Sequence, residues 1–179
     1  MKLEFNERGS KEFYDEILFV NANYYKILKN KNKKINRLTI SFIKYLIISI
    51  IFTCLTIFLY LRTNDSFYTF VIGIYIILIL FCIYFIIITN KRIKELMSRE
   101  EKITINITEN YIEYKSVNSI FKINFEDVAC ILINKYSICF VPKTTKNAMI
   151  SITSNYKDQI IKLLKKYKKE SLLNKKYEK

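Results

Sequence analysis

Residues 38–61 have the sequence LTISFIKYLIISIIFTCLTIFLYL, residues 67–88 have the sequence FYTFVIGIYIILILFCIYFIII, and only RTNDS separates them. Residues 67–88 carry no charged side chain, and neither does the first stretch from residue 45 onward. At about 1.5 Å of rise per residue, a helix of either length crosses the roughly 30 Å hydrocarbon core of a bilayer, provided that Lys44 extends its ammonium group to the headgroups. We therefore predict two transmembrane helices, at residues 38–61 and 67–88, joined by a loop at residues 62–66.

The charges beside these stretches predict their orientation, because lysine and arginine close to a transmembrane helix stay on the cytoplasmic side. The connecting loop carries only Arg62 against Asp65. Basic residues instead flank the pair on its outer ends: Lys26, Lys29, Lys31, Lys33, Lys34, Arg37, Lys91, Arg92 and Lys94. We predict a multi-pass protein of the inner (plasma) membrane with both termini in the cytoplasm and the loop outside.

The net charge of +14, from 30 basic and 16 acidic residues, bears on the class of partner. Most of the basic residues are lysine, whereas bidentate recognition of bases and phosphates relies mainly on arginine, so we expect no nucleic-acid partner. An anionic inner leaflet attracts each nearby lysine by about 1 kcal/mol. The partner that the charge favours is therefore the lipid bilayer, beginning with the basic flank before residue 38.

The composition argues against an enzyme. The chain has no histidine, and its two glycines, Gly9 and Gly73, cannot form a phosphate-binding loop. The best carboxylate pair, Glu126 and Asp127, is expected in a solvated turn. We expect no catalytic residue, no cofactor and no metal site, and we interpret the cysteines as small buried hydrophobic residues: Cys54, Cys82, Cys130 and Cys139.

Residues 1–37 are predicted to form a short strand and an amphipathic helix. Residues 2–5 alternate as in a strand, and Ser10 is a suitable N-cap for a helix that begins near Lys11. Apolar residues then recur at helical spacing as far as Leu28. Two roles stay open for this helix: packing on the cytosolic domain, or lying on a lipid surface or a partner.

A small antiparallel sheet is predicted after a helical stalk at residues 89–101. The hydrophobic period changes to two, and short turns separate six strands, at residues 102–108, 111–115, 120–125, 128–134, 136–141 and 148–152. A helix capped by Ser154 or Asn155 follows, with an apolar stripe that begins at Ile160. The cytosolic domain is thus expected at residues 102–170, with a basic tail at 171–179.

Four segments carry a resemblance to a known family: residues 103–114 (ITINITENYIEY), 123–128 (INFEDV), 149–152 (MISI) and 158–164 (DQIIKLL). In plan and in these segments the chain resembles the bacterial YcxB-like membrane proteins. The family often has an Ile-Pro-Lys-like step after its last strand, where this chain has Ile150-Ser-Ile-Thr-Ser154. The resemblance implies an α+β membrane protein: a transmembrane helical hairpin and a small antiparallel-sheet, pleckstrin-homology-like (PH-like) cytosolic domain with a C-terminal helix. It implies no catalytic residues.

The expected function is binding. We predict a membrane-anchored, non-enzymatic binding or scaffold module whose cytosolic domain recognises a protein or an anionic lipid surface. The candidate patch consists of lysines in the loop before the last strand and on the final helix: Lys143, Lys146, Lys162, Lys165, Lys166, Lys168 and Lys169. Two alternatives remain open: an immunity protein against a toxin or bacteriocin, and an accessory or self-associating subunit whose helices pack through Ser49, Thr53, Thr56 and Gly73.

Overall fold

The computed structural model describes residues 2–5, 9–30, 35–98, 103–116, 119–145 and 148–174, with only the backbone described for 2–5. The chain divides into two compact units. One is Asn36–Glu95, and the other combines Met1–Ile35 with Leu96–Lys179. The N-terminal segment thus belongs to the same unit as the predicted cytosolic domain.

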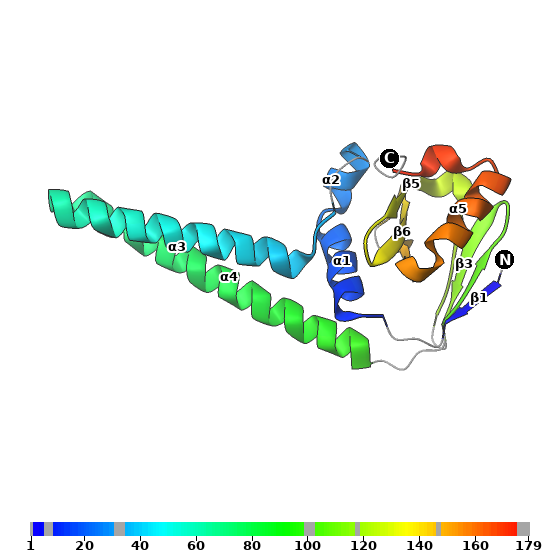
Figure 1. The fold of residues 1–179 in the computed structure, drawn as a ribbon, viewed down its shortest axis with the longest axis horizontal. Coiled ribbons are helices and arrows are strands. Elements are labelled where there is room, and N and C mark those ends of the chain that lie inside the picture. Colours follow the sequence, from blue (N-terminus) through cyan, green and yellow to red (C-terminus); the bar gives the residue numbers. More distant parts are fainter. Residues whose placement is uncertain are drawn as a thin grey trace. The chain divides into compact units, whose positions relative to one another are not determined.

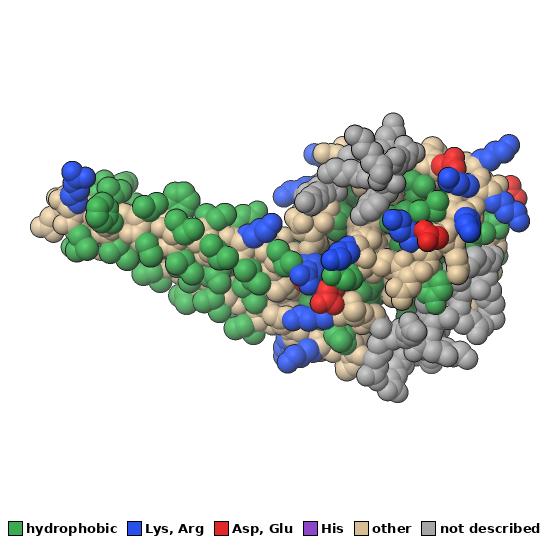
Figure 2. Space-filling model, in the orientation of Figure 1, with side chains coloured by type: hydrophobic (Ala, Val, Ile, Leu, Met, Phe, Trp, Pro, Cys, Tyr) green, Lys and Arg blue, Asp and Glu red, His purple; other side chains and the backbone are tan. Residues whose placement is uncertain are grey.

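The first unit is a hairpin of two long apolar helices, α3 (Leu38–Thr63) and α4 (Ser66–Ser98). Asn64 ends α3 in the left-handed conformation, with φ 53°, and its amide donates to the carbonyl of Tyr60 at 2.8 Å. The Asp65 carboxylate then accepts the Phe67 amide at 2.9 Å and starts α4. Both helices are long and apolar enough to span a membrane and are mostly exposed; Figure 2 shows hydrophobic side chains along them.

Aromatic stacking joins the two helices of the hairpin, and small polar residues are buried within it. The rings of Phe42 and Phe85 stack with centroids 5.1 Å apart. Ser49 and Thr56 are buried, and the Thr56 hydroxyl donates to the carbonyl of Phe52 at 2.8 Å. A Cβ atom at Gly73 would meet no atom within 4 Å, so Gly73 provides no close helix approach inside this hairpin.

The first sheet of the other unit combines strands that lie far apart in sequence. Its order is β1 (Lys2–Phe5), β2 (Ile103–Ile107), β3 (Tyr111–Lys115) and β4 (Ile120–Asn124), all antiparallel. The whole membrane-length hairpin is therefore inserted between two neighbouring strands. All four strands were predicted with nearly these bounds, and the pairing of β1 with β2 was not.

The second sheet is a meander of β5 (Val128–Ile133), β6 (Ser137–Pro142) and β7 (Ile150–Thr153). Every residue of β5 and β6 is buried, because the sheet is covered on both faces. One face packs with the first sheet and α5 (Lys157–Lys166), and the other packs against α1 (Lys11–Ala22) and α2 (Tyr24–Lys29). Figure 1 shows β6 between these helices.

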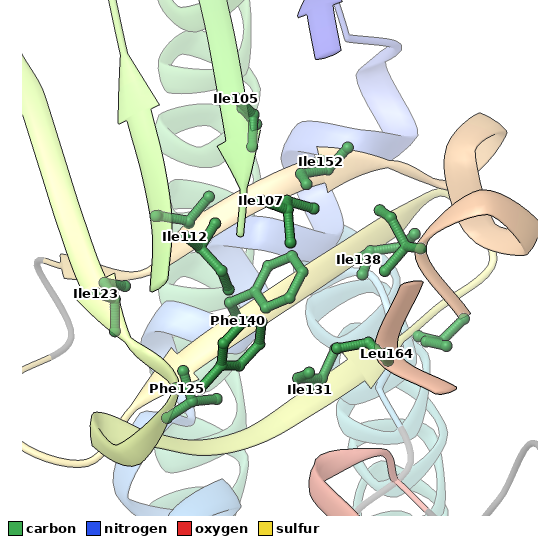
Figure 3. Packing of buried hydrophobic residues seen from close by; sticks show 14 residues of the cluster. Ile105, Ile107, Ile112, Ile123, Phe125, Ile131, Ile138, Phe140, Ile152 and Leu164 are labelled. Carbon is green, nitrogen blue, oxygen red and sulfur yellow. The ribbon is translucent and has the colours of Figure 1, made fainter. Parts of the chain in front are cut away.

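The main core fills the space between the two sheets. Figure 3 shows Ile107 and Ile112 of the first sheet meeting Phe140 of the second, with Leu164 of α5 at the side. Phe125, in the 3-10 turn η1 (Phe125–Asp127) that joins the sheets, also enters this core. The sheet-and-helix architecture predicted from residues 102–170 is thus present as two small antiparallel sheets and a C-terminal helix.

Three local details differ from expectation. The N-terminal helix is divided at Asn23 into α1 and α2. The predicted cap of the last helix is wrong, because residues Ser154–Tyr156 form the 3-10 turn η3, and the Ser154 hydroxyl donates instead to the carbonyl of Lys135 at 2.9 Å. The start of the predicted basic tail at residues 171–179 instead packs on the domain. Beyond the turn η4 (Glu170–Leu172), the Asn174 amide donates to the carbonyl of Ile131 in β5 at 3.0 Å.

Candidate functional site

The candidate site begins with the amphipathic helix α5. Ile160 and Leu164 are fully buried in the core, which turns the opposite side of the helix toward solvent. Lys162, Lys165 and Lys166 are all exposed there. Because residues three and four apart share one side of a helix, α5 brings these three lysines together into what we call the α5 lysine face.

The end of α5 extends this basic character in an unusual backbone conformation. Lys168 adopts the left-handed region, with φ 55°, and its amide donates to the carbonyl of Lys165 at 3.0 Å. The amide of Lys169 donates to the carbonyl of Leu164 at 2.8 Å. These two bonds form a Schellman motif, whose left-handed position is usually glycine. Lys168 is exposed, so its side chain projects into solvent beside the α5 lysine face.

Lys169 and Lys143 lie near η1 and make other contacts. The Lys169 ammonium is 5.9 Å from the centre of the buried Phe125 ring. Lys143 follows β6, and its ammonium donates to the carbonyl of Glu126 while its amide donates to the carbonyl of Asp127 at 2.8 Å. Glu126 and Asp127 are exposed, as expected of a solvated turn, and Lys143 bonds to their main-chain carbonyl groups.

The predicted patch is therefore only partly brought together. The α5 lysine face comprises Lys162, Lys165 and Lys166, with Lys168 following in the terminal turn. Lys143 contacts the acidic η1 turn, and Lys146 lies outside the described residues. Figure 2 shows lysine and arginine side chains interspersed with a few acidic ones on the visible face of this unit.

A buried polar network that the sequence did not single out joins α1 to the second sheet. The carboxylate of Glu16, 5% exposed, accepts the Ser137 hydroxyl at 2.7 Å and the Tyr136 amide at 3.2 Å. The Asn134 side-chain amide donates to the Ser137 oxygen at 3.0 Å. Such bonds compensate the burial of a carboxylate. The available signal was the position of Glu16 in the apolar stripe that contains Phe13 and Val20.

A second buried bond fixes α2 against the same sheet. The Tyr24 hydroxyl donates to the carbonyl of Pro142 at 2.8 Å, and burial raises the pKa of Tyr24. With Glu16, it attaches the N-terminal helices to β6. Of the two roles left open for the N-terminal helices, the described residues show the first: these helices pack on the cytosolic domain that was predicted from the sequence.

The cysteines of this unit behave as buried hydrophobic residues, as predicted. Cys130 and Cys139 are at most 1% exposed and pack in the cluster between the second sheet and the N-terminal helices. Burial raises the pKa of Cys139 to about 11, which keeps the thiol protonated and unreactive near neutral pH. In the hairpin Cys82 is also buried, but the prediction is wrong for Cys54, which is exposed on α3.

Comparison with known protein families, characterised proteins and solved structures finds no match for this chain. The candidate site is accordingly defined by its own geometry. Its chemistry is that of closely spaced ammonium groups on a rigid helix, which attract an acidic surface. Glu16, Ser137 and Cys139 are buried where α1 packs on the second sheet.

Proposed function

We propose that the chain is a membrane-anchored, non-enzymatic binding module whose α5 lysine face contacts an acidic surface. The observation that carries this proposal is the α5 lysine face itself: Lys162, Lys165 and Lys166 are exposed together on a helix anchored by Ile160 and Leu164. In the topology that we propose, α3 and α4 span the inner membrane and both termini are cytoplasmic. The domain is thereby held beside an anionic leaflet.

We further propose that the sheet-containing unit is a PH-like domain of the YcxB-like kind. Supporting this are a four-strand and a three-strand antiparallel sheet packed on one core, followed by a C-terminal helix. In this arrangement α1, α2 and the membrane hairpin are an insertion between β1 and β2. Domains of this shape bind through exposed loops and helix faces and need no catalytic residue.

Two acidic surfaces share the chemistry that the α5 lysine face requires: an anionic lipid leaflet and an acidic protein. Each lysine close to an anionic leaflet contributes about 1 kcal/mol, and this attraction weakens as salt screens it. The three lysines of the face together supply roughly 3 kcal/mol by the same measure. An attraction of that size holds a domain that is already tethered beside the leaflet, but it is too weak to recruit an untethered domain to the membrane strongly.

Lysine footprinting of the full chain tests the proposal. The full chain is acetylated briefly in three settings: nanodiscs of phosphatidylcholine, nanodiscs that also contain phosphatidylglycerol, and native membranes. Modification of Lys162, Lys165 and Lys166 is quantified by mass spectrometry. Lys11 and Lys135, exposed on other elements of the same unit, are the matched controls.

Comparison of the three membrane settings distinguishes a lipid surface from a protein partner. Salt-sensitive protection that appears with phosphatidylglycerol identifies a lipid surface, and protection found only in native membranes identifies a protein partner. If the three lysines react as fast as Lys11 and Lys135 in every setting, the α5 lysine face binds nothing and the proposal fails.

A further inference from the structure

One end of the first sheet exposes apolar side chains that the core does not cover. Among the described residues outside α3 and α4, only three large hydrophobic side chains are exposed: Tyr25, Ile120 and Phe121. Ile120 is 63% exposed and Phe121 is 43% exposed, and they are consecutive at the start of β4. The ring of Phe121 lies 6.1 Å from that of Tyr114, its partner in register on β3.

The alternation along the strands explains why this end is open. Phe121 and Tyr114 lie on the same sheet face as Ile123 and Ile112, which are buried in the core. The first sheet thus continues its apolar face past the end of the packed core. Ile120 projects from the opposite face of the edge strand. An apolar corner of this kind on a domain surface indicates an interaction site.

The strand register places this corner at the end of the sheet from which the chain leaves for the membrane. Phe5, the last residue of β1, is opposite Ile103, the first residue of β2, and both membrane-length helices lie in the chain between them. Thr104 is opposite Lys115, and Lys115 is opposite Ile120. Only residues 99–102 connect the end of α4 to the start of β2.

The side chains around the corner also match a bilayer surface. Lys115 is exposed beside the apolar residues, opposite Ile120. The ammonium of Lys122 lies 3.8 Å from the centre of the Tyr111 ring, toward the other end of β3. Aromatic and aliphatic side chains flanked by lysine suit the boundary between acyl chains and anionic headgroups. A second copy of the chain is a poorer occupant, because antiparallel pairing of two β4 edges centred on Lys122 would oppose that lysine to itself.

We propose that Tyr114, Ile120 and Phe121, with Lys115 beside them, insert into the headgroup region of an anionic bilayer as a second membrane contact of this protein. Covalent attachment to the membrane helices makes this contact intramolecular, so a small apolar surface suffices. The contact is independent of what the α5 lysine face binds. It fixes which end of the domain meets the membrane.

Tryptophan fluorescence tests this contact without background, because the chain contains no tryptophan. The full chain carrying Phe121→Trp is reconstituted in vesicles of equal parts phosphatidylcholine and phosphatidylglycerol, with or without brominated acyl chains. Tyr111→Trp is the matched control, since Tyr111 lies at the other end of β3, about 10 Å from Tyr114. Unchanged thermal melting of each variant verifies the fold.

We expect Phe121→Trp to emit at a shorter wavelength, to be quenched by brominated lipid and to be shielded from aqueous acrylamide, with the opposite behaviour for Tyr111→Trp. Adding Ile120→Asp to Phe121→Trp should abolish the lipid quenching. Equal acrylamide quenching at both positions would overturn the proposal. So would lipid quenching that survives Ile120→Asp, or a blue shift that depends only on protein density, which would indicate self-association.

Discussion

Replacing Ser137 with alanine removes a buried hydrogen bond between the N-terminal helices and the second sheet. The Ser137 side chain is fully buried, donates to the Glu16 carboxylate at 2.7 Å and accepts from the Asn134 amide at 3.0 Å. Of the two bonds to the Glu16 carboxylate described above, Ser137→Ala removes the shorter and leaves the one from the Tyr136 amide, at 3.2 Å. A buried hydrogen bond to a charged group is worth about 2 kcal/mol.

The expected consequence is local opening of α1 rather than loss of the whole fold, because the main core between the sheets does not include Ser137. A loss of about 2 kcal/mol raises the population of the opened state about 30-fold. Hydrogen exchange of the amides of α1, measured by mass spectrometry on the full chain in nanodiscs, should accelerate by that factor. Exchange in β2 and β3 should stay unchanged.

Ser171→Ala, at an exposed position of η4, is the matched control and should leave exchange in α1 unaltered. Glu16→Gln should give a smaller acceleration than Ser137→Ala, because the glutamine carbonyl still accepts a neutral hydrogen bond from Ser137. If Ser137→Ala changes exchange in α1 by less than about twofold, the bond contributes under about 0.5 kcal/mol and the reasoning about this network is wrong.

Four further predictions concern other parts of the chain. Burial raises the pKa of Cys139 from 9.0 to about 11, so the thiol ionises at lower pH in the unfolded chain than in the folded one. The free energy of unfolding should therefore be unaffected below pH 9 and fall by up to about 3 kcal/mol as the pH rises to 11. Urea unfolding should show a shallower decline for Cys139→Ala than for Cys130→Ala. Lys168→Gly should stabilise the end of α5 by about 1 kcal/mol, because glycine adopts φ 55° without strain; a lower melting temperature would contradict the Schellman assignment. Gly73→Ala should leave the melting temperature in detergent unchanged or slightly raised, since its Cβ meets nothing within 4 Å; destabilisation would reveal a partner helix at Gly73. A phosphatase reporter fused after Lys179 should be inactive and one inserted at Asn64 should be active, and the reverse pattern would overturn the proposed topology.

Local sequence patterns were sufficient for most of the secondary structure. The uncharged runs predicted α3 and α4, and the helical stalk predicted after residue 88 is present as the continuation of α4 to Ser98, where polar residues still favour helix. The alternation of Ile103, Ile105 and Ile107 gave β2, and the Ser10 cap of α1 is confirmed, since its hydroxyl accepts the Phe13 amide at 3.2 Å.

Features that depend on distant residues could not be predicted in the same way. The pairing of β1 with β2 crosses the whole membrane hairpin, and a short strand does not specify its partner. The bond between Glu16 and Ser137 joins positions 121 residues apart. At the candidate site, the lysines of the final helix were predicted as part of a seven-residue patch, but the attachment of Lys143 to the carbonyl of Glu126 depends on tertiary structure.

The central claim, binding through the α5 lysine face, is tested most directly by crosslinking from native membranes through a tag after Lys179. The full chain is compared with Lys162→Gln/Lys165→Gln and with the charge-matched control Lys11→Gln/Lys135→Gln, and both proteins and lipids are identified. We predict one of two results: a protein in stoichiometric amount that the wild type and the control capture and the α5 variant loses, or an anionic lipid class that the α5 variant captures in smaller amount than the other two chains. Capture of the same proteins and lipids in equal amounts by all three chains would contradict the account.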